Sequence, residues 1–78
     1  MDKQLFLENV KKQFIDAEDI QLTEDMEFRS IDSYDSLTGM TIMVMIKDEY
    51  SVDLLEQEYK EQKTIDELYS LVKSKTMA

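Results

Sequence analysis

The chain contains no cysteine and no histidine. Without cysteine it has no disulfide bonds, no thiolate nucleophile and no thiolate metal ligand. Without histidine it lacks both the commonest general base and the commonest metal ligand of proteins. These two absences argue against an independent enzyme, and we expect neither catalytic residues nor a metal site.

Proline is also absent, and Gly39 is the single glycine. Domains rich in β-structure need both residues at their turns, so the composition predicts an all-α fold. No apolar run approaches the roughly 20 residues that cross a bilayer, and the N-terminal residues lack the apolar core of a signal peptide. We therefore expect no membrane insertion and a cytoplasmic location.

Basic residues are few: nine stand against eighteen acidic ones, which gives a net charge of −9. A negative field repels nucleic acid and anionic lipid and favours basic protein surfaces, although the charge could also serve solubility alone. The chain has 78 residues, of which 42% are hydrophobic, enough to build a small core. We expect a single domain of residues 1–78 that acts as a monomer.

The spacing of apolar residues divides the chain into helices and one long connection. A first helix is expected over residues 3–16, with Asp2 as its N-cap and an apolar face of Phe6, Leu7, Val10 and Phe14. Residues 17–35 lose this periodicity. They form a connection that we expect to be held to the core by Ile20, Leu22, Met26 and Phe28.

Three further elements follow this connection. A second helix should begin at Ser36, with Asp35 as its N-cap, and end near Tyr50. A short element is expected over residues 56–60. The last helix should start at Thr64, because Thr64 and Glu67 have the spacing of a capping box.

The helix expected over residues 36–50 has two apolar stripes instead of one. The first contains Gly39, Ile42, Met43, Ile46 and Tyr50, and the second, on nearly the opposite side, contains Leu37, Met40 and Val44. In so small a domain one stripe can face the core, which would leave the other free to dock partner proteins. The alternative is a central helix that is buried on all sides.

Residues 28–72 resemble the acyl carrier protein family. The likeness starts from an aromatic anchor at Phe28 and continues with Tyr34-Asp35-Ser36-Leu37 and the apolar helix that ends in Lys47-Asp48-Glu49-Tyr50. It extends to Thr64-Ile65-Asp66-Glu67-Leu68. The resemblance implies a small four-helix bundle, made of three main helices and a short third helix.

The same resemblance implies roles for individual residues. Ser36 would receive 4′-phosphopantetheine from coenzyme A, in a reaction catalysed by a separate phosphopantetheinyl transferase. Recognition of the transferase and of partner enzymes would fall to Asp35, Leu37, Met40, Val44 and Asp48. The space that shelters an acyl chain would be lined by Met43, Ile46 and Leu68.

The resemblance thus implies a non-catalytic carrier of acyl thioesters for fatty-acid or specialised lipid or polyketide-type biosynthesis. Its partners would be acyl-transferring, ligase or synthase enzymes with basic docking patches. An aromatic residue before the Asp-Ser-Leu triplet, here Tyr34, resembles the pattern of carriers that serve specialised pathways. The sequence departs from the common family pattern at Thr38, Thr41, Lys47 and Gln62. Two alternatives stay open: an aminoacyl (D-alanyl-type) carrier, and an unmodified acidic adaptor that binds through Leu37, Met40 and Val44.

Overall fold

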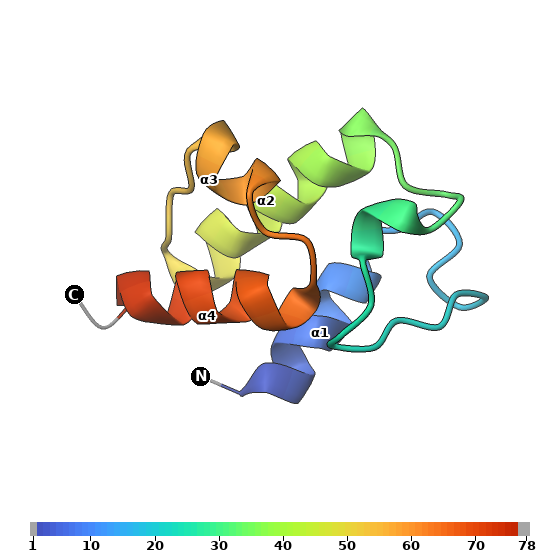
Figure 1. The fold of residues 1–78 in the computed structure, drawn as a ribbon, viewed down its shortest axis with the longest axis horizontal. Helices are drawn as coiled ribbons and strands as arrows, with labels where there is room; N and C mark the ends of the chain where they lie inside the picture. Colours follow the sequence, from blue (N-terminus) through green and yellow to red (C-terminus); the bar gives the residue numbers. More distant parts are fainter. Residues whose placement is uncertain (1, 77–78) are drawn as a thin grey trace.

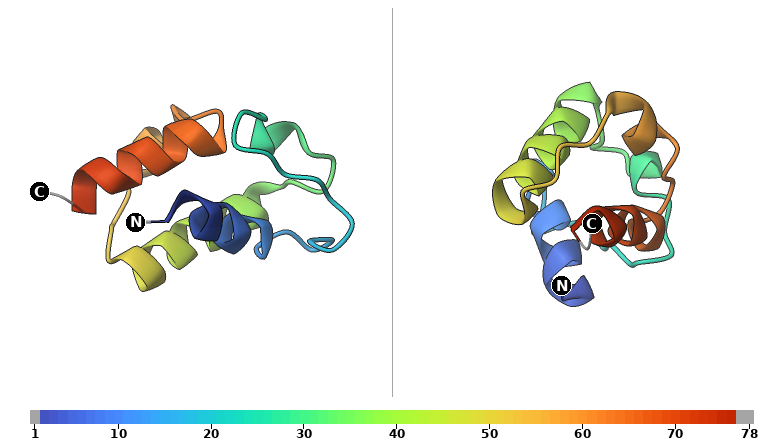
Figure 2. Two further views of the ribbon diagram at one scale, coloured as in Figure 1. Left: turned by 90° about the horizontal axis from the view of Figure 1, so that it is seen from below. Right: turned by 90° about the vertical axis from the view of Figure 1, so that its left-hand side faces the viewer.

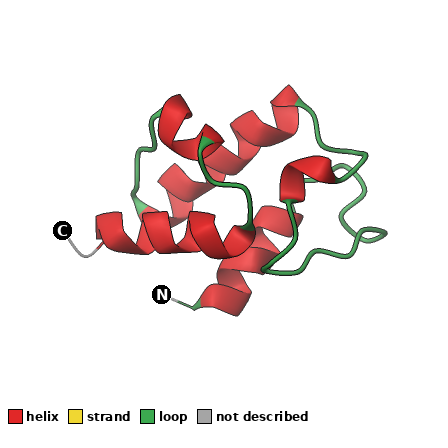
Figure 3. Cartoon of the chain, in the orientation of Figure 1, coloured by secondary structure: helices red, strands yellow, loops and turns green. Residues whose placement is uncertain are grey.

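A computed structural model describes residues 2–76 of the chain, so Met1 and residues 77–78 of the predicted domain lie outside it. Within this range every regular element is helical (Figure 3). The elements are α1 (Lys3–Lys11), the 3₁₀ helix η1 (Phe28–Ser30), α2 (Ser36–Tyr50), α3 (Glu56–Lys60) and α4 (Ile65–Thr76). The predicted all-α, four-helix architecture is therefore confirmed.

The helices α1, α2 and α4 pack against one another in pairs, and α3 lies beside α2 (Figure 1). Viewed from its end, the molecule has its four helices arranged around one interior (Figure 2). That interior is filled by apolar side chains, of which the largest without any exposed surface are Phe6, Phe28, Ile42, Ile46, Ile65 and Leu68. Burial of these side chains is the main force that holds the bundle together.

The start of α1 was predicted correctly, but the predicted end of the helix was wrong. Asp2 caps the helix, since its carboxylate accepts hydrogen bonds from the N–H groups of Gln4 and Leu5 at 2.9 and 3.3 Å. The helix ends at Lys11 instead of residue 16, because the N–H groups of Gln13 and Phe14 bond three residues back instead of four. Phe14 is nevertheless buried. Its spacing from the apolar residues of α1 therefore reflects packing into the core and not a continuation of the helix.

The connection before α2 is anchored to the core, as predicted. Leu22 and Phe28 are buried, and Ile20 and Met26 pack against the core with part of their surface exposed. The sequence pattern did not predict η1, which Phe28 opens. The connection is also tied to the beginning of α4, through a bridge between residues 27 and 64 and a hydrogen bond between residues 66 and 24.

The remaining boundaries agree with the expectation. The element α2 begins at Ser36, α3 covers the predicted residues 56–60, and α4 starts directly after Thr64. The Thr64 hydroxyl accepts the N–H of Glu67 at 3.2 Å, while the Glu67 carboxylate accepts the N–H of Lys63 at 2.7 Å. The capping interaction therefore forms, but Glu67 reaches one residue further back than the usual capping box requires.

Candidate functional site

Ser36 is the first residue of α2, and its side chain is exposed. The long connection and the start of α2 lie at the same end of the bundle (Figure 1). Immediately before the helix, Asp35 has extended backbone and acts as the N-cap. Ser36 therefore presents a hydroxyl at the positive end of a helix dipole, which is an environment that favours a phosphate group.

Asp35 holds the first turn of α2 in place through Thr38. One carboxylate oxygen of Asp35 accepts both the backbone N–H of Thr38 at 2.8 Å and the Thr38 hydroxyl at 2.9 Å. Both bonds favour the ionised carboxylate and so lower the pKa of Asp35 below its usual value. The bond from the backbone N–H has the larger effect, and the bond from the hydroxyl has the next largest. The carboxylate next to Ser36 is thus charged and fixed in orientation.

The two apolar stripes of α2 have opposite environments. Ile42 and Ile46 have no exposed surface, whereas Leu37, Met40 and Val44 are 66%, 62% and 57% exposed. The alternative of a helix buried on all sides is therefore wrong. Exposed large apolar side chains in a row are the usual mark of an interaction surface.

The exposed stripe borders a shallow groove of about 430 Å³. Leu37, Met40 and Val44 line it together with Asp48 from the last turn of α2 and Gln13 from the connection. Between Ser36 and Lys47 the helix has no acidic residue. The groove is therefore largely apolar, and the acidic residues that line it, Asp48 and Glu49, lie at the end far from Ser36.

A second hollow, of about 620 Å³, opens directly beside Ser36 between α2, α3 and η1. It is lined by Arg29, Tyr34, Ser36, Gly39, Met40, Met43, Glu56, Tyr59 and Lys60. Of the three residues expected to shelter an acyl chain, Met43 borders this hollow. Ile46 and Leu68 lie in the packed core with no exposed surface and do not border it. The open space next to Ser36 is therefore shallower than the predicted lining implies.

Two tyrosines meet in the lining of this hollow. The hydroxyl groups of Tyr34 and Tyr59 are 3.0 Å apart and share a hydrogen bond. Tyr59 is buried, which is the main reason why its pKa lies far above the usual range, and the Tyr34 hydroxyl adds to the rise. The Tyr59 hydroxyl is thus neutral and keeps its proton.

Arg29 fixes the wall of the hollow that α3 provides. Its guanidinium donates hydrogen bonds to the carbonyl oxygens of Tyr59 and Gln62, the latter at 2.6 Å. It also lies over the rings of Phe28 and Tyr59, 5.0 and 4.6 Å from their centroids. The arginine therefore ties η1 to the end of α3.

Sequence reasoning did not identify Arg29, Gly39 and Tyr59 as part of the site. One signal was present: Tyr59 is the single aromatic residue in an otherwise polar helix, Glu56–Lys60, so its ring had to be the contact to the core. Nothing in the sequence indicated that a tyrosine before Asp35 would reach across to meet it.

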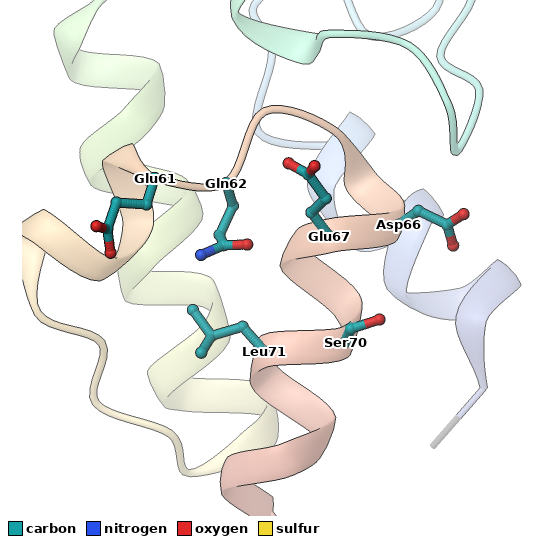
Figure 4. A pocket seen from close by; sticks show the side chains of 6 residues that line it. All are labelled: Glu61, Gln62, Asp66, Glu67, Ser70 and Leu71. Atoms are coloured by element: carbon teal, nitrogen blue, oxygen red, sulfur yellow. The ribbon is translucent and has the colours of Figure 1, made fainter.

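A further hollow, of about 630 Å³, lies elsewhere, along α4 and the loop that precedes it (Figure 4). It is lined by Glu61, Gln62, Asp66, Glu67, Ser70 and Leu71, with Gln62 and Leu71 directed into the space between α3 and α4. No residue of α2 contributes to it. It therefore does not border Ser36 and is not part of the candidate site.

Residues 6–72 match the family model described as "Phosphopantetheine attachment site". Because the match extends over most of the chain, the protein belongs to this family of acyl-carrier-type domains. No curated protein and no solved structure shows a significant match to the chain.

Domains of this family are non-catalytic and carry covalently attached 4′-phosphopantetheine. The chain is accordingly a phosphopantetheine-carrying carrier protein. None of its described helices is both long enough and apolar enough to cross a membrane. Within residues 2–76 no three acidic side chains gather in a way that could hold a metal ion.

Proposed function

We propose that Ser36 is the residue that carries 4′-phosphopantetheine and that the protein delivers acyl groups to partner enzymes. The observation that carries this proposal is the position of Ser36: an exposed hydroxyl at the first residue of α2, next to a capped and ionised Asp35. When attached, 4′-phosphopantetheine supplies the thiol that holds cargo as a thioester. The chain's own part is to position the hydroxyl for modification and to favour the phosphodiester with the helix dipole.

Residues around Ser36 fit the attached group. The serine side chain is exposed, so a transferase can reach it, and the hollow beside it offers Met40 and Met43 to an apolar chain. Methionine side chains are flexible and adapt to guests of different shape. This lining supports an acyl cargo over an aminoacyl one, because Met40 and Met43 offer apolar contacts to a carbon chain.

The exposed stripe of α2 is the proposed docking surface for the transferase and for the enzymes that load and use the cargo. Leu37 follows Ser36 directly, and Met40 and Val44 continue the same face. A partner that covers this face would hold Ser36 at its edge, within reach of an active site. Asp48, at the far end of the groove, is the proposed contact for a basic residue of the partner.

The test is the mass of the intact protein after incubation with coenzyme A, Mg²⁺ and a promiscuous phosphopantetheinyl transferase. We expect a gain of one phosphopantetheinyl group in the native chain and none in Ser36→Ala. Ser30→Ala is the matched control, because Ser30 is also an exposed serine at the same end of the molecule and should leave the gain intact.

Absence of the gain in a folded protein, with an active control carrier, would favour the unmodified adaptor. A gain that persists in Ser36→Ala would place the attachment at another residue. Cargo class is tested next, by offering the modified protein to an acyl-loading ligase and to an amino-acid-adenylating ligase. Exclusive loading with the amino acid would overturn the acyl assignment.

A further inference from the structure

The hollow beside Ser36 has one feature that a purely apolar chain does not use, namely the hydroxyl pair of Tyr34 and Tyr59. The two oxygens lie 3.0 Å apart, so one hydroxyl donates to the other. A pair of hydroxyl groups has two hydrogens and this bond consumes one of them. The second hydrogen, and the free lone pairs, remain available on the surface of a hollow that both side chains line.

The charged groups around the hollow each have a partner already. Arg29 donates to two backbone carbonyls of the α3 end, and Lys60 forms an ion pair with Glu56 at 3.0 Å. Ser36 is the proposed attachment residue. Among the neutral groups of this lining, the tyrosine pair is therefore the one left to hydrogen-bond a guest.

The pair is also held rigidly, as recognition requires. The Tyr34 ring contacts the rings of Phe28 and Phe14, both at a centroid distance of 6.2 Å, and the Tyr59 ring lies 6.0 Å from Phe28. Burial and the shared hydrogen bond raise the pKa of the Tyr59 hydroxyl, so it stays a neutral donor or acceptor at neutral pH. Gly39 lets the Tyr34 hydroxyl approach α2 closely.

We infer that the hollow recognises an acyl group that carries a hydroxyl or keto oxygen, through a hydrogen bond to the Tyr34–Tyr59 pair. Met40 and Met43 contact the carbon chain of such a group, and the tyrosine hydroxyls satisfy its oxygen. A saturated acyl chain of equal length would cover the second hydroxyl hydrogen of the pair without giving it a partner, which disfavours its entry. The inference depends on the proposed attachment at Ser36.

The test uses two cargoes that differ by one oxygen, butyryl and 3-hydroxybutyryl, transferred to Ser36 from their coenzyme A thioesters. Gly39 is the single glycine of the chain and lies against both tyrosines, so its amide gives one identifiable signal in a ¹H–¹⁵N spectrum. We expect the 3-hydroxybutyryl form to shift this signal relative to the form that carries the unloaded arm. The butyryl form should shift it at most half as much.

Tyr34→Phe and Tyr59→Phe each remove one hydroxyl and keep the ring, and either should abolish the difference between the two cargoes. Tyr50→Phe is the matched control, because the Tyr50 hydroxyl accepts a hydrogen bond from Asn9 and does not line the hollow. That variant should preserve the difference. If Tyr59→Phe does not fold, Tyr34→Phe, whose side chain is only half buried, gives the same test.

Three results would overturn the inference. The first is an equal shift of the Gly39 signal with both cargoes in the native chain, and the second is a difference between the cargoes that survives in both phenylalanine variants. The third is a Gly39 signal that the unloaded arm alone already shifts fully, so that neither cargo shifts it further. The mass of the protein separates these results from failure of the proposed function. If Ser36 does not accept the arm, the proposed function is wrong. If it is loaded with both cargoes and the spectra agree, only the recognition of oxygen is wrong.

Discussion

The Tyr34 hydroxyl oxygen lies 2.5 Å from the position that a Cβ atom on Gly39 would occupy. Carbon and oxygen atoms that are not bonded do not approach so closely, so any side chain at position 39 displaces the tyrosine. The glycine therefore has a steric role: it makes room for the hydroxyl that meets Tyr59. This explains a glycine inside α2, where it costs about 1 kcal/mol relative to alanine.

The effect of Gly39→Ala should depend on residue 34. In a Tyr34→Phe background the nearest ring atom is 3.4 Å from the new Cβ, an ordinary contact, so alanine should stabilise the helix by about 1 kcal/mol. With Tyr34 present, displacement of the hydroxyl should cancel most of that gain. Urea unfolding of the four proteins of this double-mutant cycle measures the difference. Equal effects of Gly39→Ala in both backgrounds would show that the two residues are not coupled.

Asp35 should contribute to stability in a pH-dependent way. Its pKa is lowered in the folded protein, so its contribution is complete above the unfolded value of 3.8 and is lost as the pH falls through the lower folded value. Asp35→Asn keeps an oxygen for Thr38 and should retain much of the stability at neutral pH, whereas Asp35→Ala should lower the unfolding midpoint. Relative to the native chain, the deficit of Asp35→Ala should shrink below pH 3.8. A deficit that stays constant with pH would contradict the assignment.

The two faces of α2 should respond differently to truncation. Met40→Ala and Val44→Ala remove exposed atoms and should change the free energy of unfolding by no more than about 0.5 kcal/mol. Ile42→Ala and Ile46→Ala empty the core and should cost about 2–5 kcal/mol. The initial rate of transferase modification should fall in the first two variants, although they are fully folded. Normal rates in both would move the docking surface away from this face.

Arg29 should stabilise the domain through geometry as well as charge. Arg29→Lys retains the positive charge but cannot donate to both the Tyr59 and Gln62 carbonyls in the planar arrangement seen here. We expect a loss of about 1–3 kcal/mol in chemical denaturation. Lys47→Ala is a suitable comparison, since its ion pair to Asp53 is long, at 4.0 Å, and exposed, and its loss should be nearly neutral. A similarly small effect of both changes would mean that the Arg29 contacts contribute little.

Local signals in the sequence were enough to predict most of the helices. The caps at Asp35 and Thr64 and the spacing of Ile42 and Ile46 act within one or two turns, so they can be recognised without knowing the fold. The end of α1 was missed because Phe14 packs into the core equally well from a helix and from the turns that follow Lys11. No proline or glycine marks the change.

The hollow beside Ser36 could not be predicted for a different reason. Tyr34 and Tyr59 are 25 residues apart, and their meeting depends on the path of the connection and on the position of α3. The expected lining by Ile46 and Leu68 followed from a family resemblance, which does not specify how far these side chains are packed in this chain. Both have no exposed surface, whereas Met43 borders open space.

Because α2 has no acidic residue from Ser36 to Lys47, the charges that attract a partner from a distance are not the side chains that the partner mainly contacts once bound. The net charge of −9 acts on a basic partner before the two proteins touch, whereas the surface that is then covered is apolar. Added salt should therefore slow the association of such a partner and leave the lifetime of the complex nearly unchanged. The carrier would meet its enzymes at a rate that depends on ionic strength, and the rate at which it leaves them would depend mainly on the apolar side chains Leu37, Met40 and Val44.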